Sequence, residues 1–257
     1  MEGALPSLLL LCGTVLACVV ARRGLRAGSP ALELVCAFQL CACTHELWLL
    51  GVVGRVPPAL SLSLTYTLTV VYGWTCTGAL LNPTGALQQL LSGVASGKDT
   101  VWTLGAQLLA GTAARLWALV LRALPISALH GRAGAGCSSS LRTGLWHGAG
   151  VELACAFSVH CAVRLLPTAR APLRPHLLAL VITVLVYTAG QLTGAMFNPA
   201  LAFSLNFFCQ GSSFTDNVVV YWVGPIAGMI LSVGLFDHLI PAIKRLRRGP
   251  VEPEKTE

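Results

Sequence analysis

The sequence predicts an all-α membrane protein in which six transmembrane helices and two re-entrant half-helices form an inverted repeat, preceded by an extra N-terminal hydrophobic segment. Only 11% of the 257 residues are charged and 55% are hydrophobic, whereas about a quarter of the residues in a soluble domain are charged. Six apolar runs reach the length of about 20 residues that a membrane span requires. A short motif interrupts the apolar sequence at two corresponding places.

The first hydrophobic run covers residues 5–21 and is followed by Arg22, Arg23 and Arg26. A secretory signal peptide carries its positive charge before the apolar stretch, and here the order is reversed. Residues 1–28 are therefore interpreted as an extra hydrophobic segment with a basic, cytosolic flank. Two alternatives stay open for the run itself: an additional span, or a helix that lies in the membrane interface.

Two repeats of the same design follow, at 29–125 and 146–243, with a connecting loop at 126–145 and a cytosolic tail at 244–257. Ser29-Pro30 favours a helix start at the head of the first repeat. Because each repeat contains three spans, an odd number, the repeats enter the membrane in opposite orientations. The expected helices are 32–50, 60–80 and 101–121 with a half-helix at 84–92, and 147–166, 176–196 and 218–240 with a half-helix at 200–209.

The basic residues support this topology. If the C-terminal Lys and Arg cluster is cytosolic, alternation places twelve basic residues inside the cell and four outside, and leaves Arg115 within a span. Such a bias is typical of multi-pass membrane proteins. The four basic residues placed outside the cell are Arg55, Arg122, Arg132 and Arg142. The basic clusters lie at the ends of apolar segments and form no stripe with interleaved aromatics. The sequence therefore predicts the lipid bilayer as a partner and no nucleic acid.

The interrupting motif is Thr-Gly-Ala-x-x-Asn-Pro, at 77–83 and 193–199, with five of its seven positions identical. Asn accepts the free N–H groups of a new helical turn, and Pro supplies a fixed φ where no donor is needed. Asn82-Pro83 and Asn198-Pro199 therefore predict two helix starts inside the membrane, related by internal duplication.

Inverted repeats would bring the N-terminal ends of the two half-helices together near the membrane midplane. Irregular backbone at that depth is tolerated where it is buried in protein or lines a cavity. Two positive helix ends that face each other disfavour the passage of cations, protons included. The amides of Asn82 and Asn198 offer donors to a neutral solute, so the arrangement favours small, uncharged molecules that form hydrogen bonds.

These features resemble the aquaporin family over residues 32–240. The residues that carry the resemblance are the two Asn-Pro motifs, Glu33 and Glu152 on the first helix of each repeat, Gln107 on the third helix, and the stretch 221–225 that opens the last. The resemblance implies the aquaporin fold and a homotetramer without a cofactor. It also implies that Glu33 and Glu152, with Gln107, support the pore, and that the pore motifs are Asn82, Pro83, Thr84 and Asn198, Pro199, Ala200.

Departures from the family pattern indicate the unorthodox subfamily, also called superaquaporins. Thr84 stands where the first motif usually has Ala, and Leu201 stands where Arg usually follows the second. The stretch 38–47 and the extra N-terminal segment also resemble this subfamily, which implies the endoplasmic reticulum or another intracellular membrane, with the plasma membrane as the alternative.

The outer constriction of the family falls on four apolar residues in this chain. Loss of the Arg removes a donor and a positive barrier, so we expect a pore for water, glycerol and hydrogen peroxide with modest water flux. The Ser/Thr-rich second helix leaves one register alternative, in which Tyr66 replaces the first of the four. The four positions are Leu62, Val186, Ala195 and Leu201.

A passive channel is the predicted function, with a secondary transporter or a non-conducting structural protein of an organelle membrane as alternatives. No clustered catalytic set and no metal-ligand spacing is present, so neither an enzyme nor a metal site is predicted. Cys137 and Cys209 are the cysteines outside the apolar runs, and for Cys209 the alternatives are an inert thiol, an interchain partner and a peroxide-responsive thiol.

Overall fold

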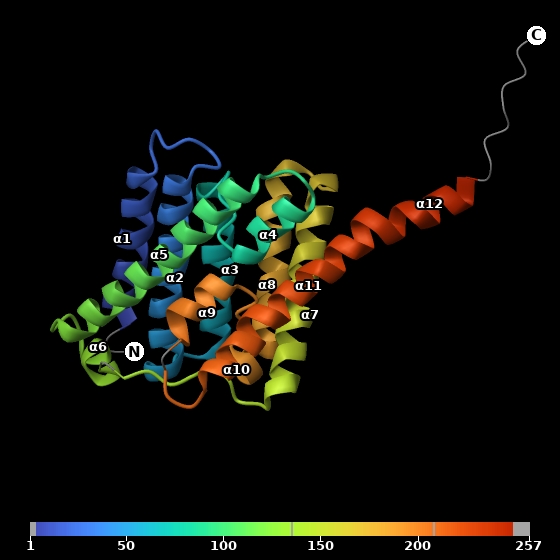
Figure 1. Ribbon diagram of the computed structural model, residues 1–257. Helices are drawn as coiled ribbons and strands as arrows, with labels where there is room; N and C mark the ends of the chain where they lie inside the picture. The colour runs from blue at the N-terminus through green and yellow to red at the C-terminus, as the bar shows by residue number, and fades with distance from the viewer. Residues whose placement is uncertain (1–3, 135, 208, 249–257) are drawn as a thin grey trace, which may run out of the picture.

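The computed structural model describes residues 4–134, 136–207 and 209–248, and this part of the chain contains helices and no strand. The helices are connected mostly by short turns (Figure 1). Their bounds are α1 Ala4–Ala21, α2 Pro30–Trp48, α3 Pro58–Thr75, α4 Pro83–Leu91, α5 Gly97–Ala123, α6 Ala128–Ala133, α7 Leu145–Leu165, α8 Arg174–Thr193, α9 Pro199–Leu205, α10 Phe214–Val218, α11 Gly224–Val233 and α12 Ile240–Arg248.

Single turns of other helix types extend several of these elements. A π-helical turn, Leu49–Val53, continues α2, and the π-helical turns Val219–Val223 and Gly234–Leu239 join α10, α11 and α12 into one long helix. Two 3₁₀ turns, Leu166–Thr168 and Ala171–Leu173, connect α7 to α8.

The two repeats are arranged as the inverted pair that the sequence predicts. Helix α2 descends from the loop at the top of Figure 1, whereas α7 rises from the bottom. Within each repeat the first helix packs on the third, so that α2 lies against α5 and α7 against α11, and α3 and α8 pack across the repeats. Each half-helix lies against the third helix of the other repeat, α4 on α11 and α9 on α5.

Six helical segments of the described chain are long and apolar enough to cross a membrane, and α3 is not among them. Its place is taken in that set by α1. The sequence of α3 is rich in Ser and Thr, and five of these hydroxyls donate to the carbonyl four residues earlier, as far as Thr75 to Val71. Because intrahelical bonding of this kind satisfies the hydroxyl groups, α3 is better suited to an apolar environment than its composition indicates.

The extra N-terminal segment forms α1, which runs beside α2 in Figure 1. Leu11 on α1 belongs to a buried apolar cluster that also contains Leu50, Leu68 and Tyr72. A helix that packs along its neighbour, rather than across the end of the bundle, favours the additional span over the interfacial helix.

The crossing of α7 and α11 depends on two glycines one turn apart. A Cβ atom at Gly224 would lie 2.7 Å from the carbonyl oxygen of Ala149, and one at Gly228 would lie 2.3 Å from that of Leu153. Real side chains do not approach backbone atoms so closely. This Gly-x-x-x-Gly stretch therefore serves close helix packing within one chain.

The structure differs from the expected boundaries in several places, and three of the differences concern the connecting loop, the second half-helix and the tail. The connecting loop 126–145 contains the short helix α6, which Ser127 caps. The second half-helix ends at Leu205 and not at 209, because the chain turns through Asn206 toward a disulfide. The tail expected from 244 is helical as far as Arg248 within α12, and the remainder of the tail lies outside the described residues.

Candidate functional site

The two Asn-Pro motifs begin α4 and α9, as the sequence predicts. Each Asn has an extended backbone and each Pro occupies the first helical position. The Oδ1 atom of Asn82 accepts from the backbone N–H of Thr84 at 3.0 Å. The Oδ1 atom of Asn198 accepts from the N–H groups of Ala200 and Leu201 at 3.1 and 3.3 Å. The caps use the oxygen of each amide and leave its nitrogen directed away from its own helix.

The two amide nitrogens join the repeats reciprocally. Asn82 Nδ2 donates to the carbonyl oxygen of Phe197 at 3.1 Å, and Asn198 Nδ2 donates to that of Leu81 at 2.8 Å. Each carbonyl belongs to the residue just before the opposite Asn. An amide nitrogen carries two N–H groups, so one N–H of each Asn fixes the opposite loop. This exchange brings the two helix starts together in the middle of the bundle (Figure 1).

Glu33 holds the first loop from α2. Its carboxylate accepts from the backbone N–H groups of Leu80 and Leu81 at 2.8 and 2.5 Å, and from Gln107 Nε2 at 2.7 Å. The residue is only 3% exposed. A buried carboxylate requires such donors, because an unpaired charge away from water is very costly. Glu33 and Gln107 therefore act together on the approach to Asn82.

Glu152 holds the second loop from α7 in a corresponding way. It is fully buried and accepts from the N–H groups of Met196 and Phe197 at 3.0 and 2.5 Å, and from the Thr193 hydroxyl at 2.5 Å. The Tyr221 hydroxyl donates to the Thr193 carbonyl at 2.7 Å. The repeats thus differ in their third donor, which is a Gln side chain from α5 in one and the motif's own Thr in the other.

The loops before both helix starts contain strained backbone. Leu81 and Phe197, each directly before an Asn, have φ of +63° and +36°, and Ala195 has +47°. Residues other than Gly rarely adopt such values, at a cost of about 1–3 kcal/mol each. The hydrogen bonds from Leu81 and Phe197 to the two glutamates hold this geometry, and it directs their carbonyl groups at the opposite Asn.

Thr84, the departure from the usual first motif, has a specific set of partners. Its hydroxyl lies 2.8 Å from Asn82 Oδ1 and 2.9 Å from His160 Nε2 on α7. His160 Nδ1 in turn lies 2.5 Å from Gln88 Oε1, one turn further along α4. A helix of the second repeat thus holds the half-helix of the first. The sequence did not predict this role of His160, and the Thr in place of Ala is the signal that could have indicated a polar partner.

The four residues assigned to the outer constriction lie in three places. Ala195 is buried in a cluster against which Val186 packs. Leu201 is buried in a second cluster that also contains Met196, while Leu62 on α3 is partly buried and belongs to neither. The structure brings Val186 and Ala195 together and places Leu201 in the first turn of α9.

The register alternative on α3 finds no support in the geometry. The Tyr66 hydroxyl lies 2.9 Å from His176 Nδ1. His176 is ten residues before Val186 on α8, which corresponds to about 15 Å along a helix axis. Tyr66 is therefore directed toward the far end of α8 from Val186, and Leu62 remains the residue predicted for the constriction.

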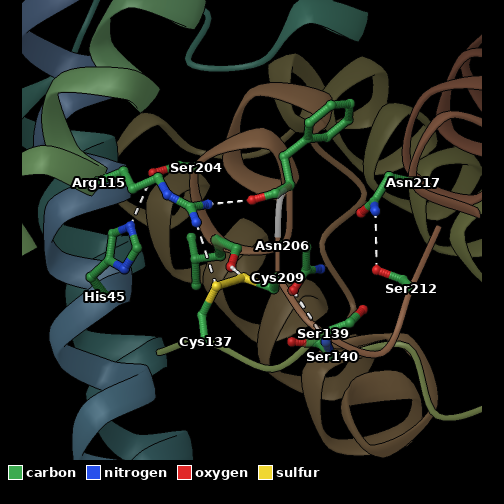
Figure 2. The surroundings of a disulfide bond; sticks show 12 residues. His45, Arg115, Cys137, Ser139, Ser140, Ser204, Asn206, Cys209, Ser212 and Asn217 are labelled. Carbon is green, nitrogen blue, oxygen red and sulfur yellow. Dashed lines mark hydrogen bonds between the residues drawn. A yellow bond between two sulfur atoms is a disulfide. The ribbon is translucent and has the colours of Figure 1, made fainter. Parts of the chain in front are cut away.

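Cys209 requires a correction. The structure pairs it with Cys137 of the same chain in a disulfide (Figure 2), so it is neither an inert thiol nor an interchain partner here. The half-helix ends four residues before it. Both cysteines had been recognised as the ones outside the apolar runs, which was the available signal for their pairing. Arg115, placed within a span, contacts the connecting loop, since its Nη2 lies 3.4 Å from Cys137 Sγ.

Comparison with known proteins gives a consistent result. Residues 55–236 match the family described as major intrinsic protein. The chain is 38% identical to human aquaporin-11 over 243 residues, which cover 93% of this chain and 89% of that protein. It is 40% identical to mouse aquaporin-12 over 253 residues, with coverage of 92% and 87%.

A solved structure shares the fold. The X-ray structure of the aquaglyceroporin from Plasmodium falciparum superposes with a TM-score of 0.60 at 16% identity. The superposition covers 85% of this chain and 100% of that one. At this identity the likeness concerns the arrangement of helices alone.

Proposed function

The chain belongs to the major intrinsic protein family, a family of membrane channels, and on that premise we propose that it conducts water, glycerol and hydrogen peroxide passively between its two Asn-Pro helix starts. It is a multi-pass integral membrane protein of the aquaporin type, and a channel rather than an enzyme by family. The solutes and the residues that select them are the proposal.

The observation that carries the proposal is the reciprocal bonding of Asn82 and Asn198. Each amide is fixed through its oxygen and one N–H, so its second N–H has a defined direction. A donor held in this way can bond a passing oxygen atom without any reorganisation of the protein. The positive ends of α4 and α9 lie at the same point, which opposes cations. A neutral hydroxyl-bearing solute is the species that both features accept.

The apolar character of the outer constriction supports the solute range. Leu62, Val186, Ala195 and Leu201 carry no side-chain donor and no charge. Water loses hydrogen bonds at such a place. The carbon chain of glycerol forms none and can contact the apolar side chains. The constriction therefore weakens the advantage of water and admits glycerol and hydrogen peroxide, with modest water flux. Without a cation at the constriction, proton exclusion depends on the helix ends alone.

Cellular location and assembly complete the proposal. The resemblance to the unorthodox subfamily supports an intracellular membrane, the endoplasmic reticulum first, with the plasma membrane as the alternative. It also supports assembly of four copies. Localisation of the full-length chain by fluorescence, together with its mass in detergent solution, tests both statements.

Proteoliposomes that contain the purified protein test the transport function. Stopped-flow light scattering measures water and glycerol permeability, and an enclosed fluorescent peroxide probe measures hydrogen peroxide entry. Replacement of Asn198 by Asp removes the donor to Leu81 and places a carboxylate at the helix starts. We expect solute flux to fall at least about tenfold, equivalent to about 1.4 kcal/mol at the barrier.

Gln210→Glu is the control for an amide-to-carboxylate change, since Gln210 is exposed on the turn beyond α9. It should leave flux unchanged. Flux that saturates at low solute concentration and requires Na⁺ or H⁺ would establish a secondary transporter instead. A folded, reconstituted protein with no flux above that of empty liposomes would favour a structural role and contradict the channel proposal.

A further inference from the structure

The Cys137–Cys209 disulfide lies outside the Asn-Pro site, between the connecting loop and the turn after α9 (Figure 2). Its two sulfur-bearing residues differ in their surroundings. Cys209 is only 5% exposed, whereas Cys137 is partly exposed and lines a surface pocket. The pocket is lined by His45, Trp48, Arg115, Arg122, Cys137 and Ser204, among others. Reagents from solution can therefore reach Cys137 more readily than Cys209.

A guanidinium lies against the sulfur of Cys137. Arg115 Nη2 is 3.4 Å from Cys137 Sγ, and Nη1 of the same side chain donates to the Phe207 carbonyl, which fixes its direction (Figure 2). Arg122, seven residues further on the same helix, lines the same pocket with its guanidinium over the Trp48 ring. The residues described as lining the pocket include no carboxylate. The charge of Arg115, which lies next to Cys137 Sγ, stabilises a Cys137 thiolate relative to the thiol.

The segments that carry the two cysteines are also held together independently of the sulfur atoms. The Ser139 N–H donates to the Gln210 carbonyl at 2.8 Å, and the Gln210 N–H donates to the Cys137 carbonyl at 3.1 Å. Asn206 Oδ1 accepts from the Ser140 N–H at 3.1 Å. These bonds can keep the cysteines within reach of each other when the disulfide opens. Closure then requires little loop ordering and is fast relative to reaction with a separate thiol.

We propose that Cys137 and Cys209 form a reversible redox pair that reacts with hydroperoxides and with small dithiols, with Cys137 as the reacting thiol and Cys209 as the resolving one. In the reduced protein the Cys137 thiolate attacks one oxygen of hydrogen peroxide. The O–O bond breaks, hydroxide leaves, and Cys137 becomes a sulfenic acid.

The second step restores the disulfide. The Cys209 sulfur attacks Cys137 Sγ, the S–O bond breaks, and the hydroxyl group leaves as water with the Cys209 proton. Two thiols and one peroxide thus give one disulfide and two water molecules, with sulfur oxidised and peroxide oxygen reduced. In the opposite direction a dithiol attacks Cys137, releases Cys209, and its second thiol then displaces Cys137 as the reductant closes its own disulfide.

Trapping of the intermediate tests the assignment of roles. The purified full-length chain is reduced with dithiothreitol, freed of reductant, exposed to hydrogen peroxide with dimedone, and digested for peptide mass spectrometry. With Cys209→Ser, dimedone is expected on Cys137. With Cys137→Ser, Cys209 is expected to remain unlabelled. Labelling of Cys209 but not of Cys137, or a disulfide that dithiothreitol leaves closed in the folded protein, would overturn the proposal.

The rate of peroxide-driven closure tests the part played by the guanidinium. Arg115→Gln should close at least about tenfold more slowly than the unmodified chain, since charge stabilisation of a thiolate by one pKa unit changes its population tenfold. Arg122→Gln is the matched control and should stay within about twofold, because its guanidinium lies over Trp48 and not at the sulfur. Equal rates for the Arg115→Gln variant and the unmodified chain would contradict the role of the charge.

Arg115→Lys is the control for a change in folding. Arg115 also binds the Phe207 carbonyl, so its loss could loosen the turn. The lysine variant keeps the charge and should close at nearly the normal rate, and closure as slow as that of Arg115→Gln would show that charge is not the cause. None of these measurements involves solute flux, so their failure is distinct from failure of the channel proposal.

Discussion

Replacement of Glu152 by Gln is expected to destabilise the second Asn-Pro loop and to reduce conduction. The carboxylate accepts three hydrogen bonds in a fully buried place, from Thr193, Met196 and Phe197. A Gln amide has the same shape but only one oxygen. In Glu152, Thr193 and Met196 donate to Oε1 and Phe197 donates to Oε2. If the Gln oxygen takes the place of Oε1, the amide nitrogen faces the Phe197 N–H. Two donors then lie against each other.

The magnitude follows from this exchange. The unsatisfied Phe197 N–H costs about 1–3 kcal/mol, and the other bonds lose the extra strength that a charged acceptor gives. The sum is about 2–5 kcal/mol of unfolding free energy, or about 5–15 °C in the unfolding midpoint of a chain of this size. Phe197 also holds a strained φ of +36° that this bond supports, so its carbonyl should move away from Asn82.

Two assays measure the outcome. Thermal unfolding in detergent, followed by size-exclusion chromatography with fluorescence detection, gives the midpoint, and proteoliposome flux gives conduction. Glu46→Gln is the control, because Glu46 is a buried carboxylate near the C-terminal end of α2 that bonds His130 of α6. Its stability should fall less and its flux should be unchanged. A Glu152→Gln variant with normal midpoint and normal flux would refute the role assigned to the carboxylate.

Three further outcomes are expected. Thr84→Val should lower the unfolding free energy by about 1–3 kcal/mol in denaturation assays, because it removes the hydroxyl that joins α4 to His160. Gly228→Ala should lower the midpoint and Gly234→Ala should not, since an added Cβ meets backbone at 2.3 Å at the first site and nothing within 4 Å at the second. Leu201→Arg should reduce glycerol flux relative to water flux in proteoliposomes, and an increase would contradict the account of the constriction.

Much of the fold could be predicted because membrane solvation leaves few choices. Apolar runs of sufficient length, an odd number of spans in each repeat and the basic flanks define an inverted pair, and the structure has it. The helix starts at Asn82 and Asn198 could be placed to the residue, because capping and the fixed φ of Pro are local effects. The end of α9 could not, since it depends on a disulfide to a distant loop.

The candidate site divides in the same way. Glu33 and Glu152 were assigned to pore support from their matched placement and family resemblance, and the structure supplies their partners. His160 was not recognised, because its partners are Thr84 and Gln88 of the other repeat, more than 70 residues away in sequence. The positions of Leu62 and Leu201 at a constriction remain predictions.

The sequence by itself determined the class of the protein, its repeats and the two points where helices begin inside the membrane. These depend on composition, period and local capping, which nearby residues specify. The tertiary structure decided which amide meets which carbonyl, which histidine holds Thr84, and that Cys209 pairs with Cys137. Such contacts join residues far apart in the chain, and their geometry is defined only when all the helices are packed together.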